Sequence, residues 1–336
     1  FGLSFFIQMD RGTAKGDNFR ARFAWRLILL FVIGFGHHLL YRGDILTIYA
    51  MVGLPLILFY KVPNRWLWVS IIFLIFGPRF LVLAIKLSQG WDLQAMTEYA
   101  DKGNETYYDI IKNGSLWAVM GINATFGFYT KMGFQWDVFA RGYQTLALFL
   151  AGFWLGRKGW FHEAEAHKKT WKRVMWGGLA VTILALGGAA VFMTGSRDIN
   201  NWPSMVGLGL YDLSNWGMTA FLVGAFVLLY LRPGSRKRLS KLAPYGRTAL
   251  TNYILQSVIG VSIFFGFGLG LIGEIGATVA LGIAILISIL QIWLSRVWLQ
   301  HYYYGPLEWL WRCATYMKWQ RFRRETPKQK EELLGS

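Results

Sequence analysis

Eight apolar runs, each about 20 residues long, alternate with short and mostly basic segments along this chain of 336 residues. In hydrocarbon every backbone N–H and C=O group must be satisfied within its own segment, so such a run crosses a membrane as an α-helix. The sequence therefore predicts an all-α, polytopic transmembrane helical bundle. We expect complete spans at residues 22–41, 43–61, 65–86, 137–156, 172–194, 205–231, 248–271 and 275–298.

The segment at residues 1–8 is apolar but too short to cross, and the chain does not begin with Met. We expect it to be the end of a truncated N-terminal span whose beginning lies upstream of Phe1. Residues 1–300 then form one transmembrane domain, with an extracytoplasmic loop at about 88–136 in which Gly and Asn separate two short surface helices. Residues 301–336 mix Tyr and Trp with Arg and Lys, which predicts a cytoplasmic amphipathic interfacial helix followed by a basic tail.

The strongly basic charge follows the predicted membrane topology. The formal net charge is +17, and the mean hydropathy is +0.35. Alternate inter-span segments and the tail hold 27 of the 35 Lys and Arg residues but 8 of the 18 Asp and Glu residues. This asymmetry is the positive-inside rule, so it places these segments and the C-terminus in the cytoplasm. Nucleic-acid binding is therefore not needed to explain the charge, and we expect membrane lipids rather than nucleic acid as partners.

A polar cluster lies in GHHLLYRGDILTIYA, at the predicted outer turn between the first two complete spans. A neutral imidazole of His37 or His38 could take a proton from a hydroxyl or amine, and Asp44 could orient that imidazole. Arg42, in the same turn, is a candidate for binding the substrate. The alternative is structural: Asp44 caps the following helix and the histidines are interfacial polar groups.

A second polar cluster lies in APYGRTALTNYILQS. Thr248, Asn252 and Gln256 recur every fourth residue and form one polar stripe on a helix, with Arg247 at its cytoplasmic end as an anchor for phosphate or carboxylate. The alternative is that the stripe makes hydrogen bonds between helices.

Charges near or within the spans have less specific interpretations. Arg22 and Arg26 stand one turn apart at a cytoplasmic helix end, where they could bind phosphates, although positive-inside topology also explains them. Arg141 has Asp137 one turn before it as a local partner. Arg79 has no local partner, which indicates an anionic ligand or a distant carboxylate such as Asp44 or Asp212.

The C-terminal segment YYGPLEWLWRCATY has the features of a helix start. Pro306 suits the first turn, Glu308 favours the positive end of the dipole, and Glu308 can pair with Arg312. Its two Trp residues would lie among lipid headgroups, so this segment is interpreted as structural anchoring.

Several of these segments together resemble the YeiB family of bacterial membrane proteins. The resemblance covers nearly the whole chain and is most specific in GDILTIYA, GRTALTNYILQS and GPLEWLWR. That family is similar in architecture to transmembrane acyltransferases, which include heparan-α-glucosaminide N-acetyltransferase. The resemblance implies that acyl-CoA binds from the cytoplasm and that an acceptor on the far side of the membrane is acylated.

The residues and the resemblance together predict a membrane-bound O- or N-acyltransferase of the bacterial inner membrane. Its acceptor would be an envelope saccharide or a lipid-linked molecule, and no metal is expected. Arg22, Arg26, Arg247, Thr248, Asn252 and Gln256 would bind the acyl-CoA, His37 or His38 with Asp44 would be catalytic, and Arg79 and Arg42 would bind the acceptor. A transporter or exporter, or an accessory subunit of a membrane complex, are the alternatives, and the sequence leaves a homo-oligomer open.

Overall fold

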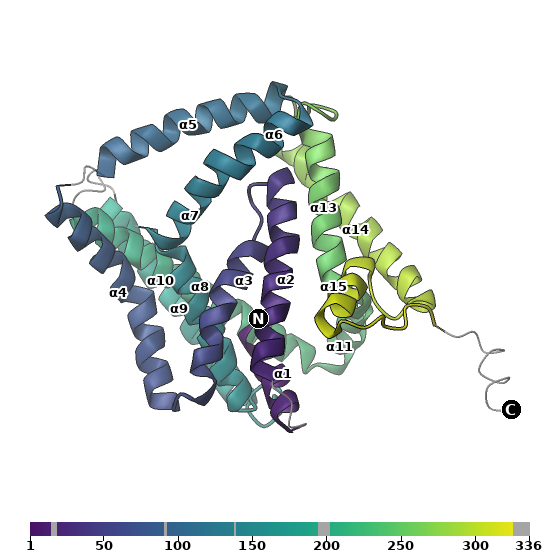
Figure 1. Cartoon of the computed structure of the whole chain (residues 1–336). Coiled ribbons are helices and arrows are strands. Elements are labelled where there is room, and N and C mark those ends of the chain that lie inside the picture. The colour runs from purple at the N-terminus through teal and green to yellow at the C-terminus, as the bar shows by residue number, and fades with distance from the viewer. Residues whose placement is uncertain (15–18, 91–92, 138, 194–201, 325–336) are drawn as a thin grey trace, which may run out of the picture. The chain divides into compact units, whose positions relative to one another are not determined.

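The computed structural model describes residues 1–14, 19–90, 93–137, 139–193 and 202–324 (Figure 1). Within these ranges the chain is helical apart from turns, loops and one isolated β-bridge between Tyr302 and Arg323, which confirms the all-α prediction. The chain forms two compact units. Unit 1 contains residues 1–20, 51–106 and 128–237, and unit 2 contains residues 21–50, 107–127 and 238–336.

The helices divide between the two units. Unit 1 contains α1 (Gly2–Ala14), the 3₁₀-helix η1 (Ile57–Lys61), α4 (Asn64–Ser88), α7 (Phe128–Trp136), α8 (Arg141–Arg157), α9 (Lys168–Met193) and α10 (Trp202–Tyr230). Unit 2 contains most of α2 (Phe19–Leu40), and also α6 (Leu116–Ile122), the π-helix η2 (Asn123–Gly127), η3 (Ser240–Leu242), α12 (Ala243–Arg247), α13 (Ala249–Phe264), α14 (Ala277–His301) and α15 (Pro306–Tyr316). Besides α2, which begins with two residues of unit 1, three helices contain residues of both units, namely α3 (Leu46–Leu56), α5 (Leu93–Asn113) and α11 (Pro233–Leu239).

Among the described residues, five helices are long and apolar enough to cross a membrane. They are α2, α4, α9, α10 and α14, and they coincide with five of the predicted spans. The other three predicted spans correspond to shorter helices: α3 followed by η1, α8 and α13. The chain is thus a multi-pass membrane protein, while the full number of eight crossings remains a prediction.

The span predicted at 248–271 ends early because its last residues are rich in glycine. Helix α13 stops at Phe264, and the chain then folds back on the end of the helix. The amides of Leu271 and Ile272 donate to the carbonyls of Ile263 and Phe264 at 3.2 and 2.9 Å, which satisfies acceptors that the helix end leaves open. The apolar run therefore contains a helix and its folded-back cap rather than one continuous span.

The segment at about 88–136, predicted as an extracytoplasmic loop, differs from its prediction in its helices. Gly103 was expected to separate two short helices, but α5 continues through it from Leu93 to Asn113 as one helix of 21 residues. An interior glycine weakens a helix by only about 1 kcal/mol relative to alanine, so the surrounding helix-forming residues outweigh it. The helix ends where the Gly114 amide donates to the Ile110 carbonyl at 2.8 Å.

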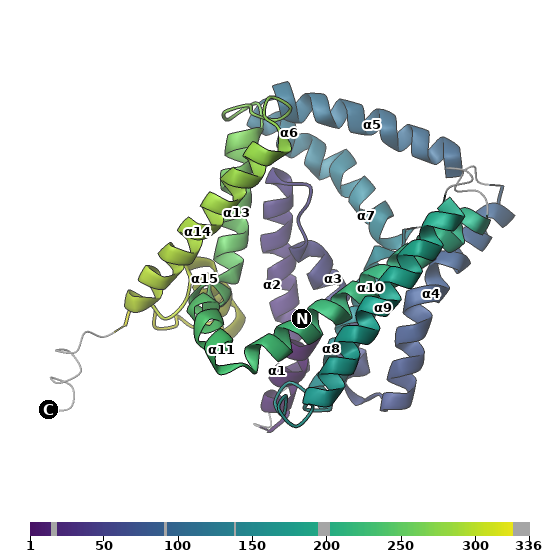
Figure 2. The same cartoon turned by 180° about the vertical axis from the view of Figure 1, so that it is seen from behind.

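In unit 1, α9 and α10 lie side by side in both views (Figures 1 and 2). Glycine makes this close approach feasible. A Cβ on Gly178 would lie 2.6 Å from the Gly217 carbonyl oxygen, and a Cβ on Gly217 would lie 2.7 Å from the Gly178 carbonyl oxygen. Small residues at helix contacts are typical of membrane bundles, where lipid tails provide no hydrophobic force between helices.

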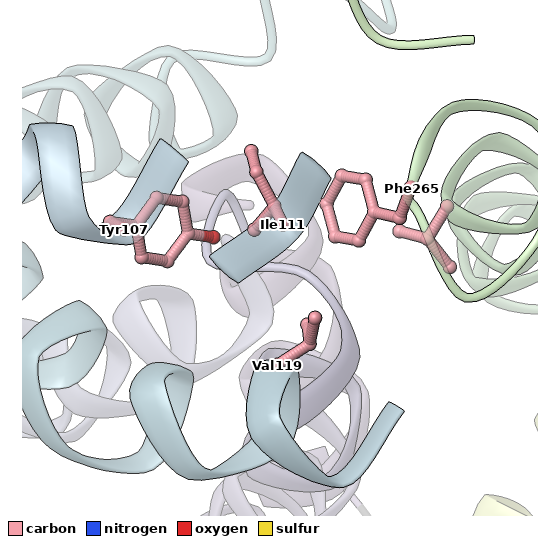
Figure 3. Packing of buried hydrophobic residues seen from close by; sticks show 5 residues of the cluster. Tyr107, Ile111, Val119 and Phe265 are labelled. Carbon is pink, nitrogen blue, oxygen red and sulfur yellow. The ribbon is translucent and has the colours of Figure 1, made fainter. Parts of the chain in front are cut away.

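In unit 2, an apolar cluster joins the end of α5, α6 and the end of α13 (Figure 3). Its buried members are Tyr107, Ile111, Val119, Val261 and Phe265. A backbone hydrogen bond also connects α5 to the segment after α13, because the amide of residue 266 donates to the Ile111 carbonyl at 2.9 Å. Side chains and backbone thus hold the end of α5 and the end of α13 together.

Helix α15 is fastened to the first turn of α13 by Glu308. Its carboxylate accepts hydrogen bonds from the Thr251 amide at 3.0 Å and from Thr251 Oγ1 at 2.5 Å. Thr248, which precedes α13, makes no side-chain cap, so Glu308 caps that helix from a distant part of the chain. Pro306 and Glu308 occupy the first turn of α15 as predicted, but the expected pair with Arg312 is wrong, because the Arg312 guanidinium lies over the rings of Tyr304 and Tyr316.

Replacing Glu308 with Gln is expected to lower the free energy of unfolding by about 1–3 kcal/mol, because charged hydrogen bonds to a helix N-terminus are lost. Thermal unfolding of the detergent-solubilised protein measures the effect. Glu274→Gln is the matched control, because Glu274 pairs with Lys112 at 3.1 Å on an exposed surface and its loss should change stability less. Equal changes in the two variants would contradict the capping role of Glu308.

Candidate active site

The candidate active site lies in unit 2, where α2 ends and α3 begins. His37 stands one turn before the end of α2, and the chain then turns so that Asp44 precedes α3. The His37 Nδ1 atom lies 2.8 Å from Asp44 Oδ1, and the exposed fractions of the two side chains are 1% and 0%. The residues that the sequence grouped together are therefore in contact.

Asp44 also caps α3, as the structural alternative predicted. Its Oδ1 accepts from the Leu46 amide at 3.1 Å, while Oδ2 accepts from the Thr47 amide at 2.9 Å and from Thr47 Oγ1 at 2.7 Å. All these partners are donors, which fits an ionised carboxylate that acts only as an acceptor. The hydrogen between Asp44 and His37 must then reside on Nδ1.

This arrangement determines the state of the other imidazole nitrogen. In a neutral imidazole that is protonated on Nδ1, Nε2 has a lone pair and can accept a proton. His37 Nε2 is buried and has no hydrogen-bond partner among the residues that the structure describes. Buried polar atoms are normally paired, so an open acceptor next to an oriented carboxylate is typical of a general base.

Tyr253 forms part of the surroundings of His37. Its ring centroid lies 5.0 Å from that of His37, and its hydroxyl oxygen accepts a hydrogen bond from the Ile45 amide at 3.0 Å. Tyr253 belongs to α13, so this contact brings the GRTALTNYILQS segment to the turn that contains Asp44. Tyr253 was not among the predicted site residues, although it stands next to Asn252 of the predicted polar stripe.

His38 has a different role, which the sequence could not separate from that of His37. Its Nε2 donates to the Asn123 carbonyl oxygen at 3.0 Å, so this nitrogen is not open as a base. The Asn123 side chain also donates to the Leu39 carbonyl at 2.9 Å and accepts from the Tyr107 hydroxyl at 2.9 Å. His38 and Asn123 thus fix the end of α2, and His37 is the better candidate for the base.

Asn123 opens the π-helical stretch η2, and sequence reasoning missed it. Such stretches occur frequently at functional sites. Burial raises the pKa of the Tyr107 hydroxyl, whereas the Arg42 guanidinium, 4.2 Å from the ring centroid, opposes the rise. Tyr107 therefore stays neutral and continues to donate to Asn123. A single Asn within LWAVMGINATFGF was the available signal, because an amide is unusual in so apolar a run.

The predicted polar stripe makes hydrogen bonds between helices. Thr248 Oγ1 and Asn252 Nδ2 approach the Ser295 hydroxyl of α14 at 3.0 and 2.9 Å, and Gln291 Nε2 donates to the Asn252 carbonyl at 3.0 Å. Thr248 and Asn252 are buried, while Gln256 is partly exposed. The structural alternative accounts for the first two residues, and Gln256 remains available to a ligand.

The predicted phosphate-binding arginines lie around the C-terminal segment of unit 2. Arg22 and Arg26 stand over the rings of Tyr316 and Trp311 at 5.6 and 4.7 Å, and Arg247 donates to the Tyr303 carbonyl at 3.2 Å. Arg22 is 15 residues before His37 on α2, which corresponds to about 22 Å along the helix. Arg22 and His37 therefore lie near opposite ends of α2.

The substrate arginine predicted at position 79 lies in unit 1. Arg79 is buried and forms an ion pair with Asp212, one of the distant carboxylates that the sequence suggested. The expected local pair of Asp137 with Arg141 is wrong. Arg141 Nη1 lies 2.6 Å from Asp212 Oδ1, and Asp137 accepts from Lys86 Nζ at 2.6 Å.

Across the described ranges, no group of three His, Cys, Asp or Glu residues could hold a metal ion.

Three comparisons place these features in context. A family model described as "Protein of unknown function (DUF418)" matches residues 155–318. The chain is 30% identical over 336 residues to the "Uncharacterized protein YxaH" of Bacillus subtilis, covering 97% of this chain and 79% of that protein. It is 26% identical over 297 residues to the "Uncharacterized protein YeiB" of Escherichia coli, covering 86% of this chain and 74% of that protein. No solved structure gives a significant match.

Proposed function

We propose that this chain, which belongs to the DUF418 family and is related to YeiB as its motifs predicted, is a membrane-bound acyltransferase. The donor would be acyl-CoA in the cytoplasm, and the acceptor would be an envelope saccharide or a lipid-linked molecule on the other side of the membrane. The observation that supports this proposal is the buried His37–Asp44 pair with its open Nε2 atom.

The proposed chemistry assigns one task to each member of the pair. His37 Nε2 takes the proton from the acceptor hydroxyl or amine while the oxygen or nitrogen attacks the thioester carbonyl. The new C–O or C–N bond forms, the C–S bond breaks, and the departing CoA thiolate receives the proton from His37. Asp44 holds Nδ1 and stabilises the imidazolium between these steps.

The proposed topology gives the protein a donor face and an acceptor face. In it, eight spans cross the inner membrane, the C-terminus is cytoplasmic, and the extracytoplasmic loop follows α4. The distribution of Lys and Arg supports this orientation. Arg22, Arg26 and Arg247 would bind the CoA phosphates near one end of α2, and the pantetheine arm would extend towards His37 past Gln256.

Replacing Arg247 with Ala is expected to weaken binding of acetyl-CoA about tenfold, which corresponds to loss of one charge-assisted contact of about 1.4 kcal/mol. Equilibrium binding to the purified protein measures the change. Arg238→Ala is the control, because Arg238 is an exposed arginine of α11 and its loss removes the same charge. Unchanged affinity in Arg247→Ala would reject this residue as a CoA anchor.

Release of the CoA thiol tests the reaction class. Purified protein should release thiol from acetyl-CoA when a hydroxyl- or amine-bearing acceptor such as glucosamine is present, and acetylated acceptor should form in equal amount. Neither product should form without the protein. Failure to release thiol with any envelope glycan or glycolipid fraction would contradict the proposed transferase.

A second candidate function is transport or export of a small molecule or lipid. The observation that favours it is Asp212 in unit 1, buried between Arg79 and Arg141, because charged groups within membrane helices often mark translocation paths. Accumulation of a substrate in protein-containing vesicles without acyl-CoA would support this function and would count against the transferase.

A further inference from the structure

Unit 1 contains a buried cluster in which two guanidinium groups share one carboxylate. Asp212 Oδ2 accepts hydrogen bonds from Arg79 Nη2 and from Gln144 Nε2, while Oδ1 pairs with Arg141 Nη1 at 2.6 Å. Arg79 also donates to the Phe139 carbonyl at 3.0 Å. The side chains of Arg79 and Asp212 are each 3% exposed. The residues come from α4, α8 and α10, so the cluster joins three helices.

The charged side chains named here, two guanidinium groups and one carboxylate, sum to one positive charge. A net charge within a membrane protein is unfavourable unless an opposite charge accompanies it. An anion in contact with Arg141 would therefore be electrostatically favourable.

Arg141 is the member of the cluster that an anion can reach. Its side chain is 26% exposed, in contrast to the buried Arg79. In the part of the chain that the structure describes, Asp212 is the ion-pair partner of Arg141, and the contact uses Nη1. A guanidinium has five N–H donors, so Nη2 and Nε of Arg141 remain for a ligand oxygen.

Exposed aromatic side chains surround this guanidinium. The Arg141 group lies 5.9 Å from the ring centroid of Phe134 and 6.0 Å from that of Tyr211. Phe139, whose ring centroid lies 5.2 Å from that of Phe134, extends the same surface. Phe134 is 46% exposed, and Phe139 and Tyr211 are each 42% exposed. An amphipathic ligand here could place an anionic group on Arg141 and an apolar chain on the exposed aromatic side chains.

We infer that Arg141 binds the phosphodiester headgroup of an anionic membrane lipid, whose acyl chains pack on Phe134, Phe139 and Tyr211. A phosphodiester carries a single negative charge and neutralises the cluster, and its two free oxygens match the open donors of a guanidinium. This site lies within unit 1 and does not depend on the acyltransferase proposal, because it involves neither His37 nor the CoA-binding residues.

Native mass spectrometry of the protein from nanodiscs that contain phosphatidylglycerol and phosphatidylcholine tests this site. The wild-type protein should retain phosphatidylglycerol, and Arg141→Gln should retain about tenfold less, because one charge-assisted contact is lost. Lys158→Gln is the control, because it removes one positive charge just beyond the opposite end of α8 and should leave retention unchanged. Equal retention in wild type and Arg141→Gln would overturn the inference.

Arg141→Gln preserves the pair between Arg79 and Asp212, so the variant is expected to fold. If it does not, Phe134→Ala with Phe139→Ala removes the apolar rim without changing the charge and should also reduce lipid retention. A competition experiment with inorganic phosphate distinguishes a lipid headgroup from a soluble anion as the ligand. Displacement of phosphatidylglycerol by millimolar phosphate would show that the site takes a soluble anion and would overturn the assignment to a lipid.

Discussion

Replacing His37 with Gln is expected to reduce the rate of acetyl transfer from acetyl-CoA by about 10²–10⁴-fold, the usual contribution of a general base. Glutamine can still donate a hydrogen bond to Asp44, so the cap of α3 should survive, but it cannot accept a proton at neutral pH. The loss should therefore appear in the maximal rate, and binding of acetyl-CoA should be unchanged. Initial rates over a range of acetyl-CoA concentrations measure both quantities.

His162→Gln is the matched control for this prediction, since His162 is exposed and lies in unit 1. It should transfer acetyl groups at the wild-type rate. A His37→Gln protein that unfolds at the wild-type temperature and retains full activity would remove His37 from the reaction.

Replacing Asp212 with Ala is expected to lower the free energy of unfolding by about 3–5 kcal/mol, because it leaves two guanidinium groups without their shared carboxylate. The buried Arg79 should account for most of this loss, since Arg141 is partly exposed and can be solvated. Denaturation of the purified protein in detergent, followed by tryptophan fluorescence, measures the change.

Two variants separate loss of the ion cluster from a general effect of removing an aspartate. Asp137→Ala should destabilise less, because the Asp137 side chain is 28% exposed. The double variant Arg79→Met with Asp212→Leu should recover part of the lost stability, because it removes the unpaired buried charge as well as its partner. Equal destabilisation in Asp212→Ala and Asp137→Ala would contradict the central place of Asp212 in unit 1.

The sequence predicted those features that depend on local pattern. Long apolar runs locate α2, α4, α9, α10 and α14, because length and hydropathy are properties of the segment itself. The acidic residue at the start of α3 was recognised as a cap for a similar reason, since capping involves residues only two and three positions away. Asp212 was also among the suggested partners of Arg79.

The features that the sequence did not predict depend on contacts between distant segments. His37 and His38 are adjacent and chemically identical, and their different roles come from Asn123, which is 85 residues after His38. The capping of α13 by Glu308 joins residues that are 57 positions apart, so local helix rules assigned that carboxylate to Arg312 instead. Contacts between residues so far apart in the sequence leave no periodic pattern from which they could be predicted.

Sealed proteoliposomes can show whether the protein moves an acyl group across the bilayer with His37 as the base. Acetyl-CoA labelled in its acetyl group is supplied outside the vesicles, and glucosamine is either enclosed within them or added outside. We predict labelled N-acetylglucosamine or an O-acetyl ester when donor and acceptor are on opposite sides, and none with His37→Gln. Product that forms only when both substrates are on the same side of the membrane would contradict transfer across the bilayer.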